Sequence, residues 1–126
     1  MPAPFAGSPW FSKRIAHVCY HLIRDTMPQS APTFPALLDH IRVLADLGYN
    51  GLLLEAEALF PFPSAPEIAT GLTWTPGEVE RLAGLADRLA LEVIPLLQSL
   101  GHNYFILMHP RYAALRELPG AFQQYC

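Results

Sequence analysis

Charged residues are scarce in this sequence, and basic residues are scarcer still. Charged residues make up 15% of the 126 residues, against 52% hydrophobic residues, which is more apolar than an average soluble domain. The chain should therefore fold around a core and not remain disordered. The eight basic residues are scattered and the net charge is -3, so no continuous basic face is available for phosphates. We expect no nucleic-acid partner.

Long apolar runs and an export signal are also missing. No run approaches the roughly 20 residues that span a bilayer, and residues 1–11 lack the charged start and long apolar centre of a signal peptide. We therefore expect no membrane partner and a cytoplasmic protein. In that setting the two cysteines, Cys19 and Cys126, are expected to remain thiols and not to form a disulfide.

Motifs for phosphate and metal binding are absent from the sequence. Neither the dinucleotide pattern GxGxxG nor the P-loop pattern occurs after any expected strand. The five histidines form no HExxH pair and have no acidic partner at a spacing typical of a metal site. The sequence therefore predicts no nucleotide, no metal and no cofactor.

Strand patterns occur three times along the chain. Residues 1–12 hold too many prolines and glycines for a regular element, and they are expected to form an irregular arm. Runs dense in β-branched or other apolar residues follow at 14–20, 50–56 and 91–97. A length near the modal domain size predicts that residues 13–126 form one domain with one core.

Helix patterns separate these strands. The first spans residues 34–47, where Thr33 is placed to cap the helix and Gly48 to end it. The second begins at a capping box formed by Thr75 and Glu78. The apolar stripe expected to be buried along this second helix is Val79, Leu82, Ala83, Ala86 and Leu89. A short helix is predicted at 111–118, after a proline.

The order strand, helix, strand, helix, strand implies parallel strands joined by right-handed crossovers. Two architectures satisfy this order, an open doubly wound sheet and part of a (β/α)8 barrel. The missing phosphate loop counts against the first. We therefore predict an α/β fold made of the first three βα units of a TIM barrel, an incomplete parallel sheet with helices.

Polar residues follow the second and third strands, at the sheet edge where such folds place their sites. Glu55 and Glu57 alternate with an alanine, so both carboxylates face the same way if the strand continues through them. Gln98 and His102 follow the third strand, and Gly101 allows the chain to turn. These side chains could grip a polyhydroxylated ligand or form an ordinary solvated rim. Residues 20–25, after the first strand, are likewise polar where the strand is apolar.

Aromatic residues and prolines alternate at residues 59–63. Such a rigid segment suits stacking against the apolar face of a sugar, because rings and fixed φ angles lose little entropy on binding. Packing of the loop on a neighbouring helix explains the composition equally well.

Taken together, these residues resemble the first part of the catalytic barrel of glycoside hydrolase family 20, the β-N-acetylhexosaminidases, and most closely its hexosaminidase D branch. The resemblance covers residues 14–117. It rests on residues 48–55 (GYNGLLLE), Glu57 with Phe60 and Pro61, residues 74–78 (WTPGE) and residues 91–102 (LEVIPLLQSLGH). The order and spacing of this set are more specific than any one member.

The resemblance implies retaining hydrolysis of terminal N-acetylhexosamine, with the substrate's acetamide as nucleophile. An adjacent Asp-Glu pair after the fourth strand would orient the acetamide and protonate the leaving oxygen. This sequence contains no Asp-Glu dipeptide and has Cys19 where the branch tends to have an acidic residue. The resemblance therefore assigns substrate binding to Glu55, Glu57, Gln98 and His102, and no catalytic residue.

With about half of the roughly 250 residues of a barrel, the chain is expected to be a fragment truncated before the fourth strand and inactive alone. A second hypothesis is a non-catalytic sugar-binding module, or a half-barrel that associates with itself through its open sheet edges. A third is a barrel enzyme of unrelated chemistry, because the fold alone does not select the reaction.

Overall fold

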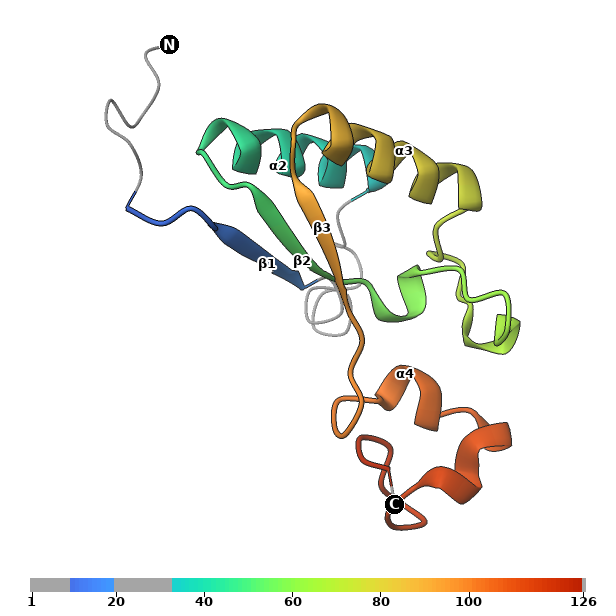
Figure 1. The fold of residues 1–126 in the computed structure, drawn as a ribbon. Helices are drawn as coiled ribbons and strands as arrows, with labels where there is room; N and C mark the ends of the chain where they lie inside the picture. Colours follow the sequence, from blue (N-terminus) through green and yellow to red (C-terminus); the bar gives the residue numbers. More distant parts are fainter. Residues whose placement is uncertain (1–9, 20–32, 126) are drawn as a thin grey trace.

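The computed structural model describes residues 10–19 and 33–125 (Figure 1). Most of the predicted arm, the residues 20–25 that follow the first strand, and Cys126 lie outside the described residues. Cys19 is present as a thiol.

The described residues form a sheet of three parallel strands in the order β1-β2-β3. The strands are β1 (Ile15–Cys19), β2 (Gly51–Glu55) and β3 (Glu92–Leu96). Their carboxyl ends are level, because Cys19 pairs with Glu55 and Glu55 pairs with Leu96. The predicted parallel α/β arrangement is confirmed, with each strand a little shorter than the apolar run that predicted it.

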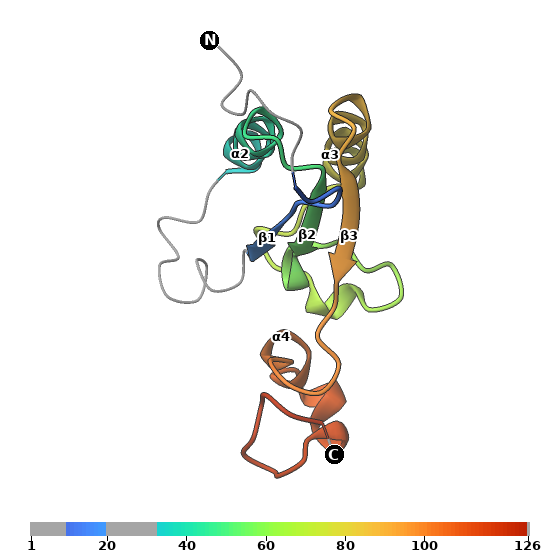
Figure 2. The same ribbon diagram turned by 60° about the vertical axis from the view of Figure 1, so that its left-hand side comes forward.

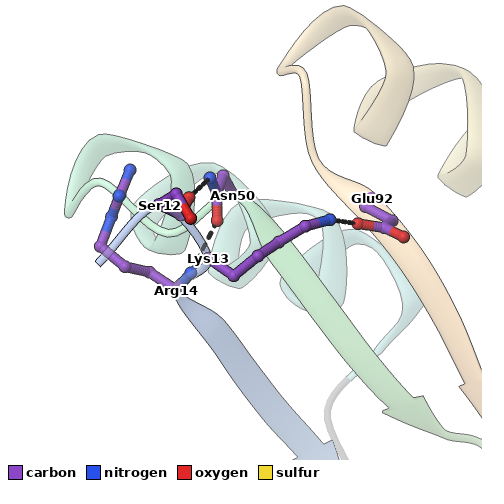
Figure 3. Close-up of polar contacts among 5 residues, drawn as sticks. All are labelled: Ser12, Lys13, Arg14, Asn50 and Glu92. Carbon is purple, nitrogen blue, oxygen red and sulfur yellow. Dashed lines mark hydrogen bonds and ion pairs between the residues drawn. The ribbon is translucent and has the colours of Figure 1, made fainter.

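Polar contacts at the other end of the sheet explain why β2 begins at Gly51 and not at Asn50 (Figure 3). The Asn50 side chain accepts from the Arg14 amide at 2.8 Å and donates to the Ser12 carbonyl at 2.6 Å. An ion pair between Lys13 and Glu92 lies beside it. These contacts anchor the chain before β1 to the starts of the other two strands.

Two helices, α2 (Phe34–Asp46) and α3 (Pro76–Arg88), lie on the same face of the sheet (Figures 1 and 2). Val18, Leu52 and Leu54 point into the core that the helices cover, because strand side chains alternate between faces. The sequence suggested a second strand covered on both faces; the helices cover only one. A doubly wound sheet has helices on both faces, so this arrangement agrees with βα units of a barrel.

The two helix starts differ in detail. Thr75 and Glu78 form the predicted capping box: the Thr75 hydroxyl accepts from the Glu78 amide at 3.2 Å, and the Glu78 carboxylate accepts from the Thr75 amide at 2.8 Å. Thr33 occupies the N-cap position of α2, but its side chain makes no capping hydrogen bond.

Along α3 the predicted stripe is partly wrong, because Ala83 is exposed and Leu85 is buried in its place.

The residues after β3 form short helical turns. These are α4 (Tyr104–Leu107) and the 3-10 helix η3 (Pro110–Leu115). The short helix predicted over 111–118 is a 3-10 helix that ends at Leu115: the backbone of Arg116 is extended and its guanidinium donates to the Leu107 carbonyl at 2.9 Å. This contact folds the end of η3 back onto α4.

A second apolar cluster joins these turns to the loop between β2 and α3. That loop contains two 3-10 helices, η1 (Glu57–Leu59) and η2 (Pro66–Ile68). The cluster is formed by Ala58, Ile68 and Phe105. The segment after β3 is therefore packed below the carboxyl edge of the sheet (Figure 1).

Candidate functional site

Glu55, the last residue of β2, is a buried carboxylate at the carboxyl edge of the sheet. Its exposed fraction is 2%. Gln98 donates to Glu55 Oε1 at 2.5 Å, and His17 Nε2 lies 3.0 Å from Glu55 Oε2. A carboxylate so buried needs polar partners to offset its lost hydration. Three elements supply this group, because His17 lies on β1 and Gln98 follows β3.

The structure therefore brings together two of the four residues that the sequence assigned to a substrate wall, Glu55 and Gln98. Their meeting follows from topology, because the carboxyl ends of adjacent parallel strands lie at one edge. His17 completes the group, since its side chain points to the same face of the sheet as Cys19.

Glu57 is placed differently from the prediction. The strand does not continue through it: β2 ends at Glu55, Ala56 has helical angles, and Glu57 begins η1 with a φ of 44°. Left-handed backbone is unfavourable for a non-glycine residue by about 1–2 kcal/mol and is often found at functional sites. The expectation that the two carboxylates share one strand face is thus wrong.

Glu57 instead lines a cavity of about 190 Å³ between η1 and α4. The other polar groups of its lining are Thr70, Tyr104 and His109. The rest of the wall is largely apolar, from residues such as Leu59, Ile68, Phe105 and Met108. A mostly apolar cavity with a few polar groups is a common setting for a small ligand.

His102 occupies the turn that the sequence assigned to Gly101. The φ of His102 is 59°, whereas Gly101 is not left-handed. The turn is held by the buried Asn103, whose side-chain amide donates to the Gly101 carbonyl at 3.0 Å and whose backbone amide donates to Gln123. His102 itself is exposed.

The segment at 59–63 contains one aromatic ring that packs against the protein and one that is accessible for stacking on a ligand. The Phe60 and Phe62 rings contact each other with centroids 5.0 Å apart. Phe62 packs against the second apolar cluster, as a structural loop would. Phe60 is 37% exposed, so its ring is still accessible for stacking.

One grouping was missed from the sequence. The ligand atoms of His17, Cys19 and Glu55 all lie within 4.8 Å of one another. The signal was an alternating His-x-Cys on one strand with a glutamate at the end of the next. Only the register, which pairs Cys19 with Glu55, reveals that the three residues meet, and that register could not be read from spacing.

Comparison with known proteins agrees with the sequence motifs. No family model matches the chain. Human hexosaminidase D is 33% identical over 118 residues, which are 93% of this chain and 23% of the human protein. Bovine hexosaminidase D is 40% identical over 73 residues, which are 57% of this chain and 21% of the bovine protein. The chain spans about a quarter of the length of these relatives.

Within the part of the chain that the structure describes, no helix has the length and apolar character needed to cross a membrane. The matched relatives agree with the resemblance that the motifs predicted. This chain is similar along nearly its whole length to hexosaminidase D.

Proposed function

We propose that this chain forms part of the substrate-binding wall of a β-N-acetylhexosaminidase of glycoside hydrolase family 20, within a (β/α)8 barrel. The reaction is the release of terminal N-acetylhexosamine by substrate-assisted, retaining hydrolysis. The observation that carries the proposal is the buried Glu55, held by Gln98 and His17 at the carboxyl edge of a parallel sheet. Similarity to hexosaminidase D supports the choice of substrate class.

The chemistry of this group suits a sugar. A carboxylate accepts hydrogen bonds from two neighbouring hydroxyls at once, and an amide beside it both donates and accepts. Because Gln98 and His17 already hold the carboxylate in place, little ordering entropy would be lost on binding. The exposed Phe60 offers a ring for the apolar face of the sugar. We assign Glu57 and His102 to the same wall.

Catalysis requires a group that protonates the leaving oxygen. The Asp-Glu pair to which the family resemblance assigns this work is absent from the 126 residues. We therefore propose that these 126 residues bind N-acetylhexosamine but do not hydrolyse its glycosides unaided.

Two measurements on the purified chain test this proposal. An aryl N-acetylglucosaminide should show no turnover above buffer. Calorimetric titration with N-acetylglucosamine and N-acetylgalactosamine should show saturable binding of at least one sugar. Glu55→Gln should weaken that binding about tenfold, since hydrogen bonds to a charged acceptor contribute about 1.5–3 kcal/mol. Glu80→Gln, on the exposed side of α3, is the matched control and should bind as the wild type does.

Turnover by the wild-type chain would contradict the proposal that the general acid belongs to an Asp-Glu pair that these 126 residues lack. Absence of sugar binding, or equal sugar affinity of Glu55→Gln and the wild type, would contradict the proposal that Glu55 is part of a substrate-binding wall.

A self-associating half-barrel is the second candidate, favoured by the sheet face on which no described helix lies. The helices lie on the opposite face, and Ile15 on this face is 45% exposed. Exposed apolar area of this kind promotes association. Gel filtration with light scattering separates the candidates, since a defined dimer supports association and a monomer excludes it.

A further inference from the structure

We propose that His17, Cys19 and Glu55 form a binding site for a thiophilic divalent cation, with Zn²⁺ as the preferred ion. The site uses one imidazole nitrogen, one thiolate sulfur and one carboxylate oxygen, all within 4.8 Å of one another. Three protein ligands leave a fourth tetrahedral position for water or another small ligand. This inference rests on the geometry of the strands and does not depend on the proposed sugar binding.

The sheet itself prearranges the ligands. His17 and Cys19 are two residues apart on β1, so their side chains point to the same face. Cys19 is the direct partner of Glu55 in the parallel register. Backbone hydrogen bonds between adjacent strands thus fix the origin of all three side chains.

The distances are compatible with one ion. Zinc bonds to nitrogen and oxygen are about 2.0–2.2 Å long, which puts two such ligand atoms about 3.4 Å apart at a tetrahedral angle. His17 Nε2 and Glu55 Oε2 are 3.0 Å apart, so these two atoms need to move apart only slightly to bind one ion. The Cys19 sulfur lies within 4.8 Å of both of these atoms, and a zinc–sulfur bond is about 2.3 Å long.

Gln98 acts as an outer support. It donates to Glu55 Oε1 at 2.5 Å, while Oε2 is the oxygen nearest His17. Hydrogen bonds of this kind orient metal-binding carboxylates, and their removal weakens metal affinity about 10- to 100-fold. The His17 side chain is 48% exposed, so an ion can reach the site from solvent.

The donor set selects the class of ion. Magnesium and calcium prefer oxygen ligands alone, whereas a thiolate with an imidazole suits zinc and similar transition metals. If Glu55 also binds sugar as proposed above, zinc and sugar compete for the same carboxylate.

Cobalt titration of the complete 126-residue chain tests the site. Co²⁺ substitutes for Zn²⁺ in such sites, and thiolate ligation gives a charge-transfer absorption band in the near ultraviolet. We expect this band to saturate at one equivalent and to disappear when Zn²⁺ is added. Cys19→Ser should abolish the band, whereas Cys126→Ser, which removes the other thiol, should leave it unchanged.

Further variants separate ligation from folding, with circular dichroism as the check on structure. Cys19→Asp keeps three ligands but removes the thiolate, so the cobalt band should disappear. This variant should still bind zinc, with an affinity at least tenfold lower than that of the wild type. Gln98→Ala should weaken zinc binding about tenfold. His40→Gln, at an exposed position on α2, should have no effect. Absence of the band in the wild type, its persistence in Cys19→Ser, or its loss in Cys126→Ser would each overturn the proposal.

Discussion

Thr33 and Thr75 occupy the same N-cap position at the starts of α2 and α3, yet only Thr75 caps through its side chain. Replacing an N-cap threonine that hydrogen-bonds costs about 1 kcal/mol. We predict that Thr75→Ala lowers the free energy of unfolding by about this amount. Thr33→Ala should change it by much less, because no side-chain capping bond is lost.

Urea denaturation of both variants, followed by circular dichroism, measures this difference. The slope of the unfolding free energy against urea concentration should stay the same, because neither substitution alters the surface area exposed on unfolding. Equal losses from the two variants would contradict the account of the helix starts.

The residue-level predictions succeeded where topology alone decides the outcome. Glu55 and Gln98 meet because they follow adjacent parallel strands. The sequence did not reveal the left-handed backbone of Glu57 and His102, a conformation that non-glycine residues adopt uncommonly.

Glu67 on η2 and two residues of η3 form the main polar link between these elements. Glu67 accepts from the Tyr112 hydroxyl at 2.6 Å and from Arg111 at 2.8 Å. The Tyr112 hydrogen bond is the largest of the effects that lower the pKa of Glu67, and the same bond raises the pKa of Tyr112. The link therefore holds η3 against η2 while Glu67 is ionised and Tyr112 is protonated.

These shifts set the sign of the pH dependence. A lowered pKa means that ionised Glu67 stabilises the fold above the ordinary glutamate pKa, and that this contribution is lost as pH falls through the folded-state value. The raised pKa of Tyr112 means that its contribution is lost as pH rises through the folded-state value. We predict that Tyr112→Phe raises the pKa of Glu67 toward its ordinary value and makes acid unfolding less steep.

Carboxyl chemical shifts followed by NMR against pH measure the Glu67 pKa directly. Tyr104→Phe, which removes a hydroxyl from an exposed ring on α4, is the control and should leave it unchanged. An unaltered Glu67 pKa in Tyr112→Phe would contradict the link.

At the scale of elements, strands and helices were predictable from their apolar patterns, and most of their ends lie within one residue of the prediction. The capping box marked the start of α3 because its residue types identify it. The start of β2 depends instead on Asn50 contacting Arg14 and Ser12, which are remote in sequence.

At the scale of the whole chain, the described residues form a sheet with the helices α2 and α3 on one face (Figure 2). Both helices pack on the face of Val18, Leu52 and Leu54, and the other face carries His17, Cys19 and Glu55. In a barrel that second face would turn inward, which would enclose the candidate site. The proposed sugar wall and the proposed zinc site thus share the only sheet face that the described helices leave uncovered.

The central claim is that the carboxyl edge of this sheet binds N-acetylhexosamine. NMR titration of the isotopically labelled chain with N-acetylglucosamine and N-acetylgalactosamine tests it most directly. We predict that one of these sugars shifts the side-chain amide signals of Gln98 and the backbone amide of Glu55, while Gly48 and Tyr49 at the opposite end of the sheet do not move. Absence of any shift, or shifts confined to Gly48 and Tyr49, would contradict the claim.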